Sequence, residues 1–416
     1  MDIEQVSISM VWTRREIMGD WKIIWQYVPI SYEAELGKLE DITQKVIIPN
    51  NLNTEQIKIK FHNLYGVEKL EIEEVTVGKI KVGEKEISDI QKVTYKCSNQ
   101  ISLEVGETLW SDVINLSITP KYDIVISCYF KKKFSVTSLC CNWSSQTWYS
   151  KFEIGKHTTD SSFIGSNTKE VLSALSFDIH EPHGEVGIMA ISGESTEEKV
   201  TEIAFFGDSI THMSYYTDPF MKMIREKQPG RVTFSNCGIG GNRLVFDATF
   251  IPEFIGNGKC FGKKGISRFE RDIYSDFQPD KVFIMEGIND YVHGYQFNNL
   301  GEVPTPLQLF DAIKELIEIG HRHGSEVYIS TIMPFGGENE PFREPAEKIR
   351  CETNKIIRES KIADGIIDLD VLIRDPVNPD FMRNNTHLGD GVHPNEQGGK
   401  EIATELFKRL IESHNL

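Results

Sequence analysis

The hydrophobic pattern changes its period near residue 195, and this change constrains the fold more than any other feature of the chain. Up to that point apolar and polar residues alternate in short runs, such as 57–61, 70–77 and 124–130. An alternation with period two buries one face of a strand. No long amphipathic helical pattern interrupts these runs. We therefore predict an antiparallel all-β domain, a sandwich or jelly roll, over residues 1–195.

Beyond a polar stretch at 193–199, interpreted as a linker, strands alternate with helices. The apolar runs expected to form strands are 203–206, 232–234, 282–285, 327–330 and 366–369. Between the third and fourth runs, Thr305 and Pro306 are typical of a helix start and Gly324 of a helix stop. Such alternation predicts a parallel, doubly wound sheet covered by helices, an α/β domain over residues 196–416.

Length and charge restrict the class of protein. A chain of 416 residues suits two domains. With 45 Lys and Arg against 62 Asp and Glu the formal net charge is −17, which disfavours nucleic acid and anionic membranes as partners. No run approaches the roughly 20 apolar residues that cross a bilayer. The N-terminus lacks a basic region followed by an apolar run, so we expect a cytoplasmic protein.

Seven cysteines show no framework spacing and are expected to be free thiols, with a vicinal disulfide between Cys140 and Cys141 as the alternative.

Four polar signatures follow strands of the predicted α/β sheet. Ser209 comes after the first strand, Gly241 after the second and Asn289 after the third, while Asp390 and His393 lie past the fifth. Sites of open α/β sheets form where the carboxyl ends of the strands meet. We therefore expect these five residues to lie together.

Their chemistry fits acyl transfer. A serine hydroxyl becomes a strong nucleophile when an imidazole takes its proton, so we assign Ser209 as nucleophile, His393 as base and Asp390 as the residue that orients the base. An oxyanion needs donors aimed at it, and the backbone N–H groups of Ser209 and Gly241 with the amide of Asn289 would supply them.

The same segments resemble the SGNH hydrolase superfamily, also called GDSL esterases and lipases. The resemblance extends to a bacterial two-domain subgroup with an N-terminal β domain. It is carried by the runs 56–77, 240–243, 268–272, 286–290, 374–376 and 393–395. The resemblance implies a three-layer catalytic domain without a metal or other cofactor. His212 and Met213 depart from the Asp-Gly common in the subgroup, and we expect them to change the pocket wall.

Several other patterns have plainer interpretations. The glycines around Gly240 lack a P-loop lysine, which disfavours nucleotide binding. No Gly-x-Ser-x-Gly elbow occurs in the sequence, which disfavours the α/β-hydrolase fold. His321 and His323 are expected at a helix C-terminus rather than on a metal. The remaining candidates are expected to serve loop structure or the β-domain core: Asp208, Asp368, Asp370, Asp375, Trp143 and Trp148.

The sequence thus predicts a serine esterase, with short acyl groups, acetyl above all, on carbohydrates as the expected substrate. The alternatives are a lipase or arylesterase of short-chain esters and a carbohydrate-binding protein with a retired hydrolase domain. The leaving group, the substrate-binding residues, the role of the β domain and the oligomeric state stay open.

Overall fold

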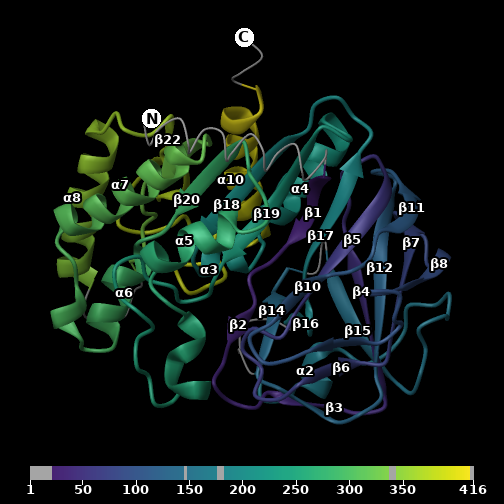
Figure 1. Cartoon of the computed structure of the whole chain (residues 1–416). Helices are drawn as coiled ribbons and strands as arrows, with labels where there is room; N and C mark the ends of the chain where they lie inside the picture. Colours follow the sequence, from purple (N-terminus) through teal and green to yellow (C-terminus); the bar gives the residue numbers. More distant parts are fainter. Residues whose placement is uncertain (1–20, 145–147, 176–181, 337–342, 413–416) are drawn as a thin grey trace, which may run out of the picture.

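The computed structural model describes residues 21–144, 148–175, 182–336 and 343–412. A β-rich part, here called the β domain (21–195), lies beside a part with helices and strands, the α/β domain (201–412) (Figure 1). No helix in the described ranges is long and apolar enough to cross a membrane.

Two five-stranded antiparallel sheets build the β domain. The first contains β1 (Trp21–Gln26), β17 (Ile188–Ser195), β5 (Thr54–His62), β10 (Thr108–Trp110) and β11 (Ile114–Ile118). The second has the order β15 (Tyr149–Ile154), β4 (Ile42–Ile48), β12 (Tyr122–Phe130), β7 (Glu74–Lys81) and β8 (Ile87–Val93). The smaller elements are β2 (Ile30–Ser31), β3 (Gly37–Leu39), β6 (Leu70–Ile72), β9 (Ile101–Leu103), β13 (Phe134–Val136), β14 (Ser138–Asn142), β16 (His183–Glu185) and the short helix α2 (Thr168–Val171). The prediction of an all-β N-terminal part is confirmed.

The alternation along β12 explains how this domain forms its core. Ile124 and Ile126 belong to the main core, whereas Val125 between them points to the opposite face and packs with Ile47 of β4 in a small second cluster. Alternate residues of a strand point to opposite faces of its sheet, so a period-two pattern yields this division.

Two details differ from the sequence prediction. The run 70–77 forms two strands rather than one, because it breaks at Glu73, whose N–H donates to the carbonyl of Tyr129 at 2.9 Å. The stretch predicted as a linker is partly strand, since Gly193 to Ser195 complete β17 and pair with β5.

A five-stranded parallel sheet forms the centre of the α/β domain, as predicted. Its order is β19 (Val232–Gly238), β18 (Thr201–Gly207), β20 (Lys281–Met285), β21 (Glu326–Ser330) and β22 (Gly365–Ile367). The chain leaves β18 for one neighbour, β19, and returns to the other, β20. This reversal places the topological switch point, where ligands bind in such sheets, at the ends of β18 and β20.

Helices of the α/β domain form two groups. In one, α10 (Glu396–Leu410) contacts α4 (Thr217–Lys227) and α9 (Leu369–Ile373). In the other, α7 (Pro306–Arg322) contacts α5 (Gly265–Tyr274) and α8 (Arg343–Glu359), and α6 (Ile288–Gln296) contacts α8. The helix α7 begins as predicted, with Thr305 and Gln308 forming a capping box before Pro306, and Gly324 follows its end with φ 81°. The remaining helical elements are α3 (Ser209–His212), η1 (Ile255–Phe261) and η2 (Leu300–Glu302).

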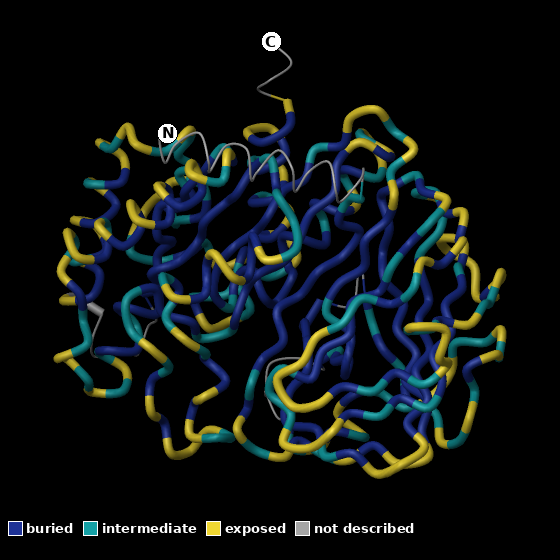
Figure 2. Tube along the Cα trace, viewed as in Figure 1, coloured by how far each residue is buried: buried dark blue, intermediate teal, exposed yellow. Residues whose placement is uncertain are grey.

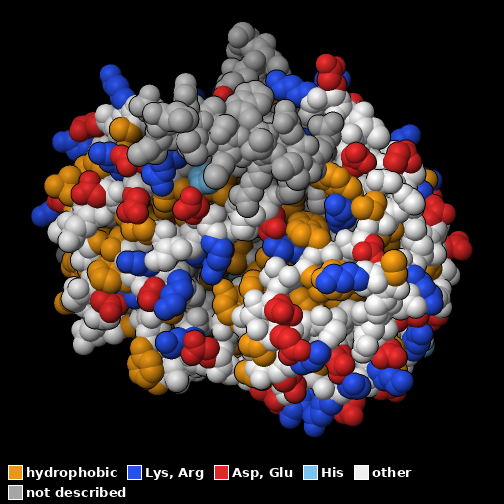
Figure 3. Space-filling model, viewed as in Figure 1, with side chains coloured by type: hydrophobic (Ala, Val, Ile, Leu, Met, Phe, Trp, Pro, Cys, Tyr) orange, Lys and Arg blue, Asp and Glu red, His pale blue; other side chains and the backbone are white. Residues whose placement is uncertain are grey.

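The two domains share one continuous hydrophobic core. The strand β1 lies along the edge strand β19, and Tyr27 just after β1 forms a parallel bridge with Asn236. The buried carboxylate of Glu202 accepts hydrogen bonds from the backbone of Ile23 at 2.8 Å and from Lys22 at 3.0 Å. Buried segments therefore run across the boundary, whereas exposed residues gather in outer loops and on helix surfaces (Figure 2). Acidic and basic side chains are interspersed on the face in Figure 3.

Candidate active site

Ser209 stands at the turn between β18 and α3. The preceding Asp208 caps this helix, because its carboxylate accepts a hydrogen bond from the N–H of Ile210 at 2.9 Å. Asp208 thus fixes the turn, as the sequence analysis expected. Ser209 is only partly buried, and its own N–H belongs to the first turn, where N–H groups have no intrahelical acceptor.

The three residues predicted as a catalytic triad lie in hydrogen-bond contact. The Oγ of Ser209 is 2.8 Å from Nε2 of His393, and Nδ1 of His393 is 2.5 Å from Oδ2 of Asp390. A neutral imidazole in this arrangement carries its proton on Nδ1, toward the carboxylate, and accepts the serine proton at Nε2. This is the geometry that a serine nucleophile and its base require.

A tight loop before α10 holds the base. The second oxygen of Asp390 accepts hydrogen bonds from the N–H groups of Val392 at 2.9 Å and His393 at 3.0 Å. The N–H of Leu388 donates to the carbonyl of His393 at 2.9 Å. Asn395 caps α10 and donates through its amide to the same loop. The loop therefore positions His393 without help from a substrate.

The pKa of Asp390 keeps its carboxyl ionised. Burial opposes ionisation, but the hydrogen bond and charge of His393, together with the N–H groups of Val392 and His393, outweigh it and lower the pKa of Asp390 to about 2. A carboxylate that stays charged at neutral pH stabilises the imidazolium formed when His393 takes a proton.

Gly241 lies in a turn that follows β19. The N–H of Ile239 donates to the carbonyl of Gly207 at 3.0 Å, which joins this turn to the one that carries Ser209. Gly241 has φ 70°, and a Cβ there would come within 2.2 Å of the Phe261 ring. A side chain is excluded by conformation and by space, so the glycine is a structural requirement of the turn.

Asn289, at the start of α6, contacts the same turn. Its amide Nδ2 donates to the carbonyl of Asn242 at 2.9 Å. The side chain of Asn242 in turn donates to the carbonyls of Phe261 at 2.7 Å and Lys263 at 2.8 Å. An amide nitrogen has two N–H groups, so one of them is left for an oxyanion when the other holds Asn242.

A fully buried arginine that the sequence analysis did not assign ties these parts together. Arg268 donates to the carbonyls of Gly207 and Cys237 at 2.8 Å each, and to the side-chain oxygen of Asn242 at 2.8 Å. The positive charge of Arg268 is compensated by the carboxylates of Glu286 and of Asp272, at 3.0 Å each. Only the four-residue spacing of Arg268 and Asp272 on one helix could have indicated this role.

Two more buried acids, Asp208 and Asp290, lie near Glu286. Burial raises the pKa of Asp208 to about 7, although the hydrogen bond from Ile210 and the charges of His393 and Arg268 lower it. Burial likewise raises the pKa of Asp290 to about 6, while Asp290 accepts the N–H groups of Leu244 at 2.7 Å and Val245 at 2.9 Å.

The sequence analysis expected His212 to change the pocket wall, but the structure places this residue in the interior. The side chain is buried, and its Nδ1 accepts the N–H of Gly240 at 3.1 Å. Its Nε2 lies 3.4 Å from Sγ of Cys141, and its ring meets the edge of Trp143 with centroids 4.8 Å apart. His212 therefore faces inward, between the β domain and the turn of Gly240 and Gly241, here called the oxyanion turn after the role that the sequence predicts for Gly241.

The plainer interpretations of the other candidates agree with the structure. His321 pairs with Asp364 at 2.8 Å and His323 stacks on Tyr274, both at the end of α7. Arg358 pairs with Asp368 and Asp370, and Asp375 accepts the N–H groups of its own loop.

Trp143 and Trp148 of the β domain are both buried. Trp148 packs edge-on against Trp25 and Tyr27. Cys140 and Cys141 are free thiols.

Comparison with known proteins identifies the class of this domain. Residues 205–400 match the model of the GDSL-like lipase/acylhydrolase family. These residues of the α/β domain therefore form a GDSL-like lipase/acylhydrolase domain. Among proteins with curated descriptions, none matches this chain.

Solved structures similar to the chain cover about half of it. One is a putative acylhydrolase from Bacteroides fragilis, with 17% identity over 52% of this chain and 89% of that one and a TM-score of 0.38. Another is an acetyl xylan esterase with 20% identity over 50% and 100%, and a TM-score of 0.37. A third is a catalytic mutant of an acetylxylan esterase from Geobacillus stearothermophilus, with 18% identity over 51% and 95%, and a TM-score of 0.38.

Proposed function

We propose that the protein is a serine esterase that hydrolyses carboxylic esters through an acyl-enzyme on Ser209. The observation that carries this proposal is the pair of contacts from Ser209 through His393 to Asp390. The family of the α/β domain supports an ester hydrolase. A carbohydrate-binding protein with a retired hydrolase domain would have no physical need for this arrangement.

The proposed reaction has two halves. His393 takes the proton of Ser209 as its Oγ attacks the ester carbonyl, and the resulting oxyanion accepts hydrogen bonds from the N–H groups of Ser209 and Gly241 and from the amide of Asn289. His393 then gives its proton to the leaving alcohol. Water then attacks the acyl-enzyme while His393 takes its proton, and His393 returns that proton to Oγ of Ser209 as the carboxylic acid leaves.

We propose short acyl groups, acetyl above all, as the part of the substrate that Ser209 receives. Packing at the oxyanion turn supports this choice, because the Phe261 ring lies directly against Gly241. The Phe261 ring therefore occupies the space on that side of the nucleophile. A long acyl chain would need space there.

A carbohydrate as leaving group is supported by a groove of about 920 Å³ beside the catalytic loop. Tyr215 and Trp143 contribute aromatic surface, while Lys222, Asn395 and Lys400 contribute polar groups. Sugars bind through apolar ring faces and several hydroxyl groups, so a mixed aromatic and polar lining suits them. Trp143 also contacts His212, next to the oxyanion turn.

The experiment that tests the esterase compares the native chain with Ser209→Ala on p-nitrophenyl acetate. We expect the variant to lose activity and to unfold at nearly the same temperature. A serine-reactive organophosphate should add its mass to Ser209 alone. Labelling at another residue, or an active alanine variant, would remove Ser209 from the mechanism.

The substrate class needs a separate panel. p-Nitrophenyl esters of increasing chain length and acetylated oligosaccharides should show a fall in kcat/KM beyond the shortest acyl groups and the highest values on acetylated sugars. Equal or better turnover of long-chain or aryl esters would favour the lipase or arylesterase alternative instead.

A further inference from the structure

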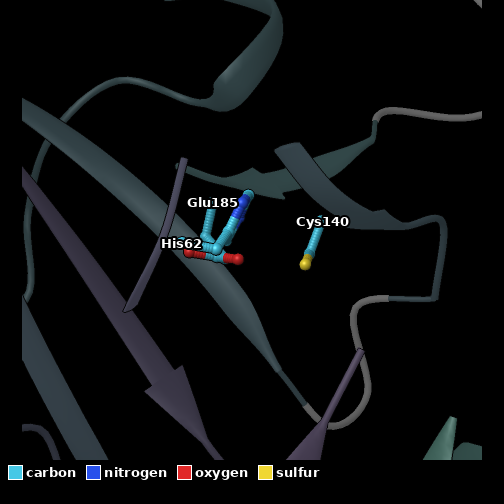
Figure 4. Close-up of side chains that lie close together, drawn as sticks. All are labelled: His62, Cys140 and Glu185. Atoms are coloured by element: carbon cyan, nitrogen blue, oxygen red, sulfur yellow. The ribbon is translucent and has the colours of Figure 1, made fainter. Parts of the chain in front are cut away.

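A second cluster of reactive side chains lies inside the β domain. His62 ends β5, Cys140 lies in β14 and Glu185 ends β16, and one ligand atom of each lies within 4.8 Å of the others. All three are buried, with exposed fractions of 2% for His62 and 0% for the other two. Figure 4 shows His62 and Glu185 next to each other, with the sulfur of Cys140 facing them.

Hydrogen bonding leaves this cluster incomplete. Among the described residues, neither ring nitrogen of His62 has a hydrogen-bond partner, and the same holds for Oε1 of Glu185. The other oxygen of Glu185 accepts the N–H of Ile188 at 2.9 Å. Buried polar groups are nearly always paired, because leaving water without a new partner is costly. Several orphaned atoms at one place therefore call for a ligand.

Other buried histidines in this protein show the contrast. His212 has a partner on each ring nitrogen, and His293 has one at Nδ1, where Thr249 lies at 3.0 Å. Another group of possible ligands, Glu153 with His157 and Asp160, is half-exposed. There His157 is already satisfied by Asp160 at 2.8 Å and by a backbone carbonyl at 2.9 Å. Within the part of the chain that the structure describes, that group leaves one buried ligand atom without a hydrogen-bond partner, Oε2 of Glu153, whereas the fully buried cluster leaves three, both ring nitrogens of His62 and Oε1 of Glu185.

We propose that His62, Cys140 and Glu185 bind a zinc ion that fastens three strands of the β domain. Imidazole nitrogen, thiolate sulfur and carboxylate oxygen are the three ligand types that zinc takes in proteins. Zinc–ligand distances of about 2.0–2.3 Å put neighbouring ligand atoms about 3.5 Å apart in a tetrahedron. The ligand atoms lie within 4.8 Å of one another, so zinc binding would draw the three side chains inward, with water as the fourth ligand.

Charge favours a divalent ion. A neutral imidazole, a thiolate and a carboxylate carry two negative charges, which the ion neutralises, so the buried complex has no net charge. The thiol, and the carboxyl where it is protonated, release their protons to solvent on binding. The thiolate selects a borderline-soft metal such as zinc over magnesium or calcium, which prefer oxygen ligands throughout.

The backbone supports the arrangement independently of the ion. Cys140 and Glu185 are directly opposed in the antiparallel pairing of β14 and β16. The N–H of His62 donates to the carbonyl of Gly187 at 2.9 Å, which holds the end of β5 beside β16. The residue after Cys140 is Cys141, which contacts His212. The ion would therefore stabilise the strand that meets the oxyanion turn.

The test uses the full chain produced in zinc-supplemented medium and measures bound metal by mass spectrometry. We expect about one equivalent of zinc in the native chain. Cys140→Ser and Glu185→Gln keep the size of each side chain and should lower zinc content at least roughly 10-fold. His157→Ala, in the half-exposed group, is the matched control and should retain the full equivalent.

A second measurement follows metal binding directly in solution. The native chain is stripped with a chelator and titrated with Co²⁺, whose thiolate complex has a charge-transfer band in the near ultraviolet. The band should appear at one equivalent and be absent from Cys140→Ser. Absence of both zinc and the cobalt band in the native chain overturns the proposal. Equal zinc content in the native chain and in both site variants does so as well.

Discussion

His212 accepts a hydrogen bond at Nδ1 from the backbone N–H of Gly240 at 3.1 Å, so a side chain of α3 holds the turn that carries Gly241. Burial lowers the pKa of His212 to about 3, and the imidazole is therefore neutral near pH 7. Because Nδ1 is the acceptor, the ring proton lies on Nε2 and faces Sγ of Cys141. One neutral imidazole thus links the oxyanion turn to the β domain.

We predict that His212→Leu lowers kcat about 10-fold with little change in KM. Removing an oxyanion donor outright costs roughly 10²–10³ in kcat, and misplacing the turn beside it should cost a part of that. His212→Asn can keep an acceptor near the N–H of Gly240 and should retain more activity than the leucine variant. Steady-state kinetics well below both melting temperatures check this. Equal kcat in the two variants would show that the hydrogen bond does not position the turn.

Asn289→Ala should lower kcat by roughly 10²–10³ while KM changes only modestly, because the oxyanion carries its full charge only near the transition state. The contact with Asn242 adds a second expectation, a loss of stability of about 1 kcal/mol from the missing hydrogen bond. Asn289→Asp should be at least as harmful, since a carboxylate repels the oxyanion. Kinetics and melting curves measure both effects.

A melting curve alone does not separate the two roles of Asn289, because the residue holds the turn as well as the proposed oxyanion. Assays far below the melting temperature of the alanine variant do so. Near-normal kcat in the folded variant would leave Asn289 with a structural role only.

Acid should destabilise the protein through its buried histidines. Burial lowers the pKa of His212 and of His293 to about 3, whereas an unfolded histidine titrates near 6.5. Between these values the unfolded state binds more protons, so stability is lost as pH falls from about 6.5 toward 3. Asp208 acts in the opposite direction, because burial raises its pKa to about 7.

The contribution of one histidine is isolated by comparing the native chain with His293→Gln. Glutamine can keep a hydrogen bond to Thr249, which lies 3.0 Å from His293. The variant should lose less stability with acid, by roughly 1.4 kcal/mol per pH unit between pH 6 and 4.5. Denaturant unfolding at several pH values measures this. Parallel curves for the two proteins would show that His293 does not bind its proton more weakly in the folded state.

Part of the site follows from sequence because two of its residues come directly after strands. Ser209 and Asn289 follow the strands β18 and β20 of one parallel sheet, so strand prediction brings them to the same end of that sheet, whereas His393 lies farther along the chain, in the loop before α10. The period of the hydrophobic pattern likewise distinguishes the two kinds of sheet, since burial of one face or of both leaves different sequence patterns.

The parts that sequence did not reveal depend on contacts between distant segments. His212 meets Cys141 across 71 positions of the chain, and nothing local to either residue indicates that the imidazole faces inward. From the sequence, Arg268 would be expected on the exposed face of a helix. In the structure it is buried, because carbonyls and a carboxylate from separate segments surround it. The cluster around His62 likewise combines strands without any ligand spacing in the sequence.

The final prediction concerns the α/β domain without its β domain. Residues from about 196 onward, expressed alone, should be poorly soluble. The strand β19 is an edge of the parallel sheet and is covered by β1, so the truncation exposes both an unpaired edge and apolar surface of the shared core. Exposed edges and large apolar patches promote aggregation.

Soluble yield and size-exclusion chromatography measure this effect against the full chain as control. Expression of residues 1–195 as a separate chain in the same cells should restore part of the solubility, because it restores the cover of β19 and the contact of Glu202 with the backbone of Ile23. A soluble, monomeric truncation with full esterase activity would show instead that the α/β domain folds and functions independently. In that case the shared core would be a contact between two self-sufficient domains, and the link from Cys141 through His212 to Gly240 would have no effect on catalysis.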